Sequence, residues 1–291
     1  ENRGQIFSIH MIVVWGGLAL GQGLFAVDDP AGVSLFLLAS ILLSVSLIPI
    51  LLTEIKAPET DAQESLGLRA LWKASPSGVA TIGLSGLASA GFFGLGTIYA
   101  VKAGLSVSET ALFMTLFIGF GAASQWPLGW LSDKIDRRKV ILLCCASVIS
   151  ICIVLASFEF TSKILLILSA LVGAFTLPLY SLGVAQANDR LEPKQMISAS
   201  GTIVLVFSAF AALGPFTMSY FLELFEMFGF MIYMGIVHLA IAVTVLIMMF
   251  INQDVDESDQ SDFQVMAQRP SLVAMEVIAE EAIESQGESD S

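Results

Sequence analysis

The densest set of charged side chains in the apolar part of the chain is a short run in its middle. It reads Gly129-Trp-Leu-Ser-Asp133-Lys-Ile-Asp136-Arg137-Arg138-Lys139, with two carboxylates among four cations. These residue types support electrostatic contacts, because an ionised carboxylate such as Asp133 is attracted to the exposed amides of a helix N-terminus. The sequence carries no His-Glu-x-x-His, Gly-x-Ser-x-Gly or Gly-x-x-x-x-Gly-Lys-Ser/Thr motif beside it. The run therefore predicts a contact site and not a catalytic one.

Two long apolar stretches flank this charged run in the sequence. The stretch before it, about 107–132, carries one acid, Glu109, and no base, and the stretch after it, about 140–158, carries no charge. A helix needs about 20 apolar residues to cross a bilayer. We therefore expect a tight loop at the lipid surface between two membrane-spanning helices.

Composition supports a membrane protein. Of 291 residues, 56% are hydrophobic and 13% are charged, whereas soluble domains are about 25% charged. The net charge of −13 comes mainly from the end of the chain, where residues 254–291 hold 11 acids and one base. The expected partner is the lipid bilayer, and nothing in this composition suggests nucleic-acid binding.

Eight apolar segments reach spanning length. Backbone amides in lipid must be bonded within their own segment, so each is predicted to be a helix, and the fold class is an all-α polytopic membrane bundle. The predicted spans are 6–27, 31–53, 76–101, 107–132, 138–158, 163–187, 196–222 and 227–251. Along the third span, Gly86, Ala90 and Gly94 recur every four residues and predict a close-approach face for another helix.

Basic residues predict the orientation, since loops on the cytoplasmic side are rich in Lys and Arg. With the N-terminus inside, ten bases fall in inside loops and two in outside loops, the latter being Lys102 and Lys163. Both ends of the chain are then cytoplasmic, and the expected location is a bacterial inner membrane. The inside bases are Arg3, Lys56, Arg69, Lys73, Lys134, Arg137, Arg138, Lys139, Arg190 and Lys194.

The longest internal loop divides the chain. Residues 1–53 form a two-helix unit, 54–75 a cytoplasmic linker, 76–251 a six-helix bundle and 252–291 an acidic tail expected to be mostly disordered. The linker ends in an apolar patch suited to the membrane interface: Leu66, Leu68, Leu71 and Trp72.

The charged run resembles the signature loop of the major facilitator superfamily, Gly-x-Leu-small-Asp-basic-x-Gly-Arg-basic-basic. Asp136 stands where the family has Gly, and Asp tolerates a left-handed backbone better than most residues. The preceding Gln125-Trp-Pro-Leu-Gly129 and the opening Asn2-Arg-Gly4 are most similar to the YcaD-like branch. The matching positions are Gly129, Leu131, Ser132, Asp133, Lys134, Arg137, Arg138 and Lys139.

This resemblance implies a secondary transporter that moves a small solute by alternating access. The eight spans then correspond to helices 5–12 of a twelve-helix fold, with helices 1–4 as missing partners, and the chain alone is expected to be inactive. Gln5-Ile-Phe-Ser8, where the chain enters the first span, also resembles Gln195-Met-Ile-Ser198, where it enters the seventh, as expected of related halves.

The resemblance also implies a gating role for the loop. Asp133 would contact the cytoplasmic end of helix 5, near residues 4–7, while Arg137 and Arg138 hold it in place. Gly129 and Lys134 complete the loop. The contact would latch the outward-facing state. The alternative is that the cations only enforce membrane topology.

Two further sets of residues are candidates for transport. His10 and His238 are the titratable groups within spans and candidates for ion coupling, although a lone His is more often a packing residue. By analogy with the family's cavity-lining helices, the candidates for the solute path are Ser89, Phe93, Tyr99, Gln125, Trp126, Tyr180 and Gln186. Each of these polar groups could equally bond a neighbouring helix.

No cofactor or metal site is expected. The three cysteines, Cys144, Cys145 and Cys152, lie in one apolar run and suit packing. A membrane enzyme would need His, Asp or Glu clustered at one face, and the loops lack such a cluster. The remaining alternative is a non-transporting scaffold or sensor that acts through its acidic tail, which would lose its partner on deletion of residues 254–291.

Overall fold

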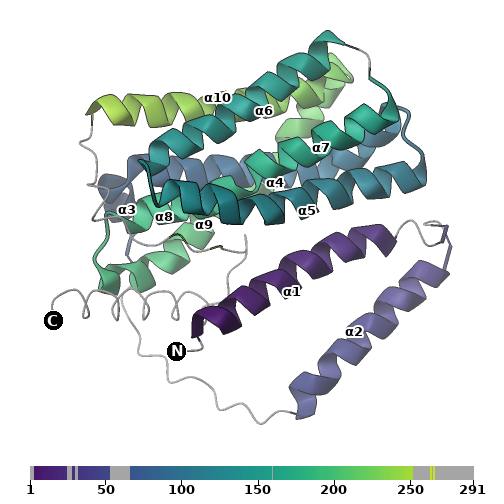
Figure 1. Cartoon of the computed structure of the whole chain (residues 1–291), viewed down its shortest axis with the longest axis horizontal. Coiled ribbons are helices and arrows are strands. Elements are labelled where there is room, and N and C mark those ends of the chain that lie inside the picture. The colour runs from purple at the N-terminus through teal and green to yellow at the C-terminus, as the bar shows by residue number, and fades with distance from the viewer. Residues whose placement is uncertain are drawn as a thin grey trace.

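The computed structural model describes residues 3–24, 28–29, 32–52, 66–158, 160–251, 263 and 265, and every regular element in this part is a helix (Figure 1). The helices are α1 (Arg3–Gly23), α2 (Ser34–Leu52), α3 (Leu68–Ala74), α4 (Pro76–Lys102), α5 (Val107–Ser132), α6 (Arg137–Ser157), α7 (Ser162–Thr176), α8 (Pro178–Asn188), α9 (Pro193–Phe225) and α10 (Phe228–Ile251).

Six helical segments in the described part are long and apolar enough to cross a membrane. They match the last six predicted spans to within a few residues, with α7 and α8 together forming one of them. The break between these two falls at Leu177, and Pro178 takes the first turn of α8, where its missing N–H is not needed. The first two predicted spans coincide with α1 and α2, whose crossing of the membrane stays a prediction.

Helices α4 to α10 pack into one bundle around α8. Every residue of α8 is buried, and α4 packs along α9, α5 along α7 and α6 along α10. Because α8 is covered on all sides, the charged residue that follows it, Asp189, meets several neighbouring helices at one end of the bundle.

The small-residue face predicted on α4 packs against α9. A Cβ on Gly86 would lie 2.6 Å from the carbonyl oxygen of Phe207, and one on Gly94 would lie 3.0 Å from Pro215. The Cβ of Ala90 faces Gly214 in the same way. The predicted close approach is therefore present, and α9 is its partner.

Short turns bring the helix ends together in two groups. At one end, α5 stops at Ser132 and α6 begins at Arg137, next to the end of α8 and the start of α4. At the other end, Gly104 turns the chain with φ +85°, and Ser106 caps α5 in a reciprocal capping box with Glu109. The first end carries the charged run.

Helix α1 lies beside α5, with α2 farther from the bundle (Figure 1). The hydroxyl of Thr115 in α5 lies 3.4 Å from the carbonyl oxygen of Ala19, and Trp15 is buried in the main apolar cluster. Thr115 lies in the first half of α5 and Ala19 near the end of α1, and Figure 1 shows the two helices running in opposite directions. Nearly all described residues of α2 are exposed, including Phe36 and Leu51.

The linker and the tail are described only in part. Residues 54–65 of the predicted linker lie outside the described residues, and the remainder contains the short helix α3. Its Leu71 is fully buried, which differs from the interfacial position expected, whereas Leu68 and Trp72 are exposed. Of the predicted tail, Phe263 and Val265 are described and the other positions lie outside the described residues.

Candidate functional site: a charged network at one end of the bundle

Asp136 begins α6, and its conformation corrects the sequence interpretation. Its backbone has φ −48° and ψ 118°, outside the left-handed region. Its carboxylate instead caps α6 by accepting the backbone N–H of Arg138 at 2.9 Å. An Asp fits this position because it satisfies a helix-end amide, and not because it tolerates a left-handed turn.

Arg138 folds back onto the same carboxylate. Its Nε and Nη2 donate to the Asp136 oxygens at 3.1 and 3.0 Å, and the Arg138 side chain is buried. This bidentate pair differs from the expectation that Arg138 holds Asp133. The turn geometry explains the difference, since a carboxylate at the helix cap is two residues away and lies within reach of the guanidinium.

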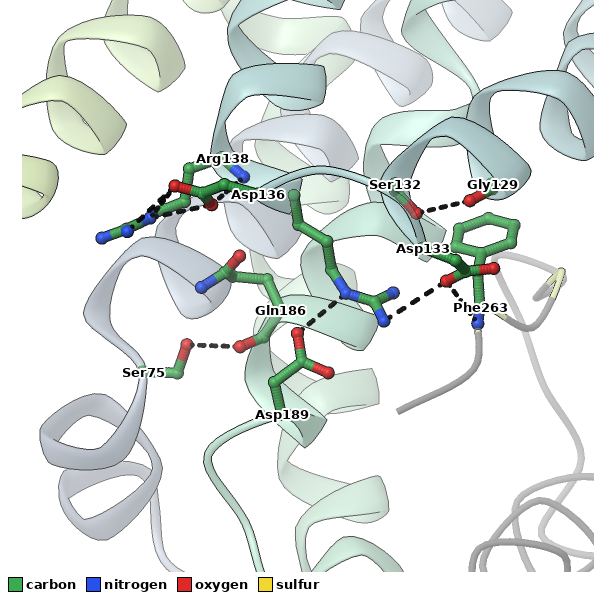
Figure 2. A network of polar contacts seen from close by, with 10 residues as sticks. Ser75, Gly129, Ser132, Asp133, Asp136, Arg138, Gln186, Asp189 and Phe263 are labelled. Carbon is green, nitrogen blue, oxygen red and sulfur yellow. Dashed lines mark hydrogen bonds and ion pairs between the residues drawn. The ribbon is translucent and has the colours of Figure 1, made fainter. Parts of the chain in front are cut away.

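Arg137 joins two carboxylates from different elements. Its side chain is fully buried, its Nε lies 2.8 Å from Oδ2 of Asp189 and its Nη2 lies 3.5 Å from Oδ1 of Asp133. The Asp189 side chain is 2% exposed and that of Asp133 is 34% exposed. Figure 2 shows Asp133 and Asp189 on separate helix ends. The guanidinium thus ties the turn between α5 and α6 to the end of α8.

Asp189 is a member of the site that sequence reasoning missed. The available signal was a charged pair, Asp189-Arg190, directly after a long apolar span. Burial, with the nearby charge of Arg138, lowers the pKa of Arg190, and the neighbouring carboxylates of Asp189 and Asp136 oppose this. Arg190 remains protonated at any physiological pH because an arginine guanidinium does not lose its proton in proteins.

Hydroxyl groups fasten the backbone around this network. Ser132 donates to the carbonyl oxygen of Gly129 at 2.7 Å, and Ser75, before α4, donates to the carbonyl oxygen of Gln186 in α8 at 3.0 Å (Figure 2). Lys134 lies outside the network, with its ammonium 3.8 Å from the centre of the exposed Trp130 ring. The ends of α4, α5, α6 and α8 are thereby held together.

The expected partner of Asp133 on α1 stays a prediction. Because α1 and α5 are antiparallel, the N-terminal end of α1 points toward the end of the bundle that carries Asp133. The side chains of residues 4–7 lie outside the described residues. The fold therefore places the start of α1 and the end of α5 at the same end of the bundle.

His238 is buried between α10 and α7, and both of its ring nitrogens are bonded. Nδ1 lies 2.7 Å from the carbonyl oxygen of Met234, and Nε2 lies 3.2 Å from the hydroxyl of Thr176. A carbonyl oxygen only accepts, so Nδ1 carries the proton and neutral Nε2 accepts from Thr176. This arrangement favours the packing role over the coupling role. His10 is in α1, and its side chain lies outside the described residues.

The residues predicted for the solute path are distributed through the bundle. Tyr99 stacks on Phe230 with ring centroids 4.2 Å apart, and Gln125 accepts a hydrogen bond from Ser181 at 2.8 Å. Tyr99, Gln125, Ser89, Tyr180 and Gln186 are buried, Phe93 is half-buried and Trp126 is exposed. The structure does not gather them around one open cavity, and their role stays a prediction.

An apolar groove of about 620 Å³ lies between α3, α4 and α9. Sequence reasoning did not select its lining as a site, because seven of the eight residues are apolar and read as packing or interface positions. They are Leu68, Arg69, Trp72, Val79, Ala80, Leu84, Val206 and Phe210. Within the described part of the chain, no three His, Cys, Asp or Glu residues are grouped to hold a metal.

Chemically, the network can make, break and exchange ion pairs. Arg137–Asp189 is desolvated and fixed, whereas Asp133 is partly exposed and more loosely held. A carboxylate in that position is able to accept a second donor that approaches from outside the bundle.

Comparison with known proteins identifies the family. The uncharacterised MFS-type transporter YcaD of Salmonella arizonae is 28% identical over 219 residues, which are 74% of this chain and 56% of that protein. The proteins of the same name from Escherichia fergusonii and Escherichia coli are 24% and 26% identical over 217 residues. The chain thus spans little more than half the length of these relatives. No solved structure matches.

The sequence profile of the Major Facilitator Superfamily matches residues 1–161 and 78–280. The chain is accordingly an integral membrane protein with several apolar helices, and its relatives are described as MFS-type transporters. The expected resemblance and the expected absence of enzyme activity are confirmed, and the chain belongs to the Major Facilitator Superfamily.

Proposed function

We propose that the chain is part of a secondary transporter that moves a small solute by alternating access. Asp133 would be the exchangeable member of a contact at one end of the bundle. We call this contact, between Asp133 and its donors, the lock. Family membership and the description of the relatives as MFS-type transporters support this proposal. The observation that carries it is the contrast between the two carboxylates bound to Arg137.

That contrast separates a fixed contact from a movable one. A buried ion pair is strongly destabilising to break, by about 3–5 kcal/mol, because it leaves an uncompensated charge, whereas an exposed pair contributes about 0–1 kcal/mol. Arg137–Asp189 belongs to the first class and Arg137–Asp133 approaches the second. Asp133 can therefore leave Arg137 for another donor without loss of the bundle.

The two N-terminal helices suggest how the lock is used. We assign α1 and α2, in residues 1–53, to one helical unit of the transporter and residues 76–251 to the other, with 54–75 linking them. Helix α1 packs on α5, and the apolar α2 is exposed along nearly all of its described length. An exposed apolar helix needs lipid or further helices as its surroundings, and the matched segment covers 56% of the relative from Salmonella arizonae, which therefore has residues outside the match.

In this proposal the charged end of the bundle faces the cytoplasm of a bacterial cell, and the lock closes the inner side in the outward-facing state. Asp133 then exchanges contacts between Arg137 and the start of α1 as the two units rock. The solute enters between the units, so the path residues become accessible only in one of the two states.

The test is solute flux through the complete gene product that contains this chain. Everted membrane vesicles are incubated with a defined mixture of small metabolites, and the vesicle contents are compared by mass spectrometry with vesicles that lack the protein. We expect at least one solute to accumulate or to be depleted. Asp133→Asn should slow this flux by about 10- to 100-fold, since a hydrogen bond to a charged group contributes about 1.5–3 kcal/mol.

The matched control is Glu223→Gln, which neutralises an exposed acid near the opposite end of α9. It should retain the wild-type flux at equal amounts of inserted protein. Absence of any flux in the wild type, or an Asp133→Asn variant as fast as Glu223→Gln, would contradict the proposed function.

A further inference from the structure

Phe263, which follows α10 in the chain, contacts the charged turn between α5 and α6. The backbone N–H of Phe263 donates to Oδ1 of Asp133 at 2.9 Å, the same oxygen that faces Arg137. Figure 2 shows the Phe263 ring beside Gly129. The proposed movable carboxylate thus already holds a second donor, and that donor belongs to the C-terminal tail.

Gly129 makes room for the aromatic ring. A Cβ at this position would overlap the Phe263 ring, so only glycine leaves the space. The ring is half-buried against an apolar cluster that includes Leu128 and Val140, and Val265 packs against the neighbouring cluster to which α1 contributes Trp15. The contact therefore combines a shaped apolar seat with a charge-assisted hydrogen bond.

The charges of the two partners are complementary. Residues 254–262, directly before Phe263, hold five acids and no base, and the turn from Asp133 to Lys139 holds four cations and two acids, with Lys134 and Lys139 as its exposed cations. Opposite charges favour association, and salt screens this attraction. The sequence next to Phe263 thus suits the turn on which Phe263 lies.

We propose that the end of α5 is a docking site for the chain's own tail, with Phe263 as the anchor, and that the docked tail restrains the lock. The inference rests on the proposed function in one respect, namely that Asp133 exchanges partners during transport. While Phe263 is docked, one Asp133 oxygen is engaged and the seat over Gly129 is filled. Release of the tail makes this Asp133 oxygen and the space over Gly129 available to the moving helical unit.

Docking is tested without any transport assay, by hydrogen exchange of the full chain in lipid nanodiscs. The amide of Phe263 should exchange at least about 10-fold more slowly than an unprotected amide, because it is hydrogen-bonded in the native state. Gly129→Ala should abolish this protection. Its control is Gly119→Ala on the same helix, where a Cβ meets nothing within 4 Å, and this variant should leave the protection unchanged.

A second pair of variants guards against misfolding of Gly129→Ala. Phe263→Ala should lose the protection of the segment and Phe263→Leu should retain part of it, while exchange within α5 and α8 stays at wild-type rates in both. Raising the salt concentration from about 0.05 to about 0.5 M should speed exchange of the segment, since the screening length falls about threefold. An unprotected Phe263 amide in the wild type, or equal protection in Phe263→Ala, would overturn the inference.

The regulatory consequence is tested separately in the flux assay. Phe263→Ala should transport about 3- to 10-fold faster than the wild type, because a larger fraction of molecules then has a free lock. If Phe263→Ala transports at the wild-type rate although hydrogen exchange shows docking in the wild type, the restraint is refuted and the docking site still stands. If the wild type transports a solute but its Phe263 amide is unprotected, the inference is refuted and the proposed transport function still stands.

Discussion

At the scale of single residues, environment decides what each carboxylate of the charged network does. Asp136 is committed to a helix cap and to Arg138, and Asp189 is committed to Arg137 at 2.8 Å in a buried site. Asp133 alone combines partial exposure with a longer contact to Arg137. The same residue type therefore supplies a cap, an anchor and an exchangeable contact.

Arg137→Gln tests the anchor. The substitution leaves the buried Asp189 carboxylate uncompensated, so the free energy of unfolding should fall by about 3–5 kcal/mol. Reversible denaturation in detergent micelles measures this change. Lys139→Gln, an exposed cation two residues away, should remain within about 0.5 kcal/mol of the wild type.

The double variant Arg137→Gln with Asp189→Asn adds an internal check. Because it removes both charges, it should be more stable than Arg137→Gln alone. If Arg137→Gln is no less stable than Lys139→Gln, the buried pair does not hold the turn to α8.

At the scale of elements, the contact of α4 with α9 is made possible by small residues. Gly86 and Gly94 allow the α9 backbone and Pro215 to approach α4 more closely than any larger residue permits. In lipid, such close packing replaces the hydrophobic effect as the source of helix association. This contact supports the wall next to the apolar groove between the same two helices.

Gly86→Leu should therefore separate the two helices. Overpacking of this kind lowers the free energy of unfolding by about 1–3 kcal/mol. Reversible denaturation in detergent micelles measures this change. Gly201→Leu on α9 is the control, because a Cβ there meets nothing within 4 Å, and it should differ from the wild type by less than about 1 kcal/mol. Equal stability of the two variants would show that the close approach is not required.

At the scale of the whole molecule, charge is distributed between the two ends of the bundle. The turn from α5 to α6 and the segment after α8 carry bases at the network end, whereas Lys102 and Lys163 lie at the other end. Loops rich in Lys and Arg stay on the cytoplasmic side of a membrane. The network end is therefore expected to face the cytoplasm.

Single added cysteines test this orientation, because the native Cys144, Cys145 and Cys152 are buried. A membrane-impermeant maleimide should label Lys163→Cys on intact cells. It should label Lys139→Cys only in inverted membrane vesicles. The reverse labelling pattern would contradict the orientation and would place the lock on the outer side.

The sequence by itself determined the apolar segments, the small-residue face on α4 and the family's signature loop. These features are local: a segment in lipid must bond its own backbone, so length and composition are enough to predict a helix. The end positions of α5 and α6 followed from the same rule, because the charged residues between them are excluded from lipid.

Only the tertiary structure decided the pairing of the charges and the surroundings of the polar groups. Asp189 reaches Arg137 because helices distant in the sequence end at the same place, and Phe263 reaches Asp133 from a position 130 residues away in the chain. The burial of Tyr99 and Gln125 likewise depends on the neighbours that packing supplies. Local composition sets which segments enter the membrane, whereas helix packing sets which side chains meet, and the second is not encoded in any single stretch of the chain.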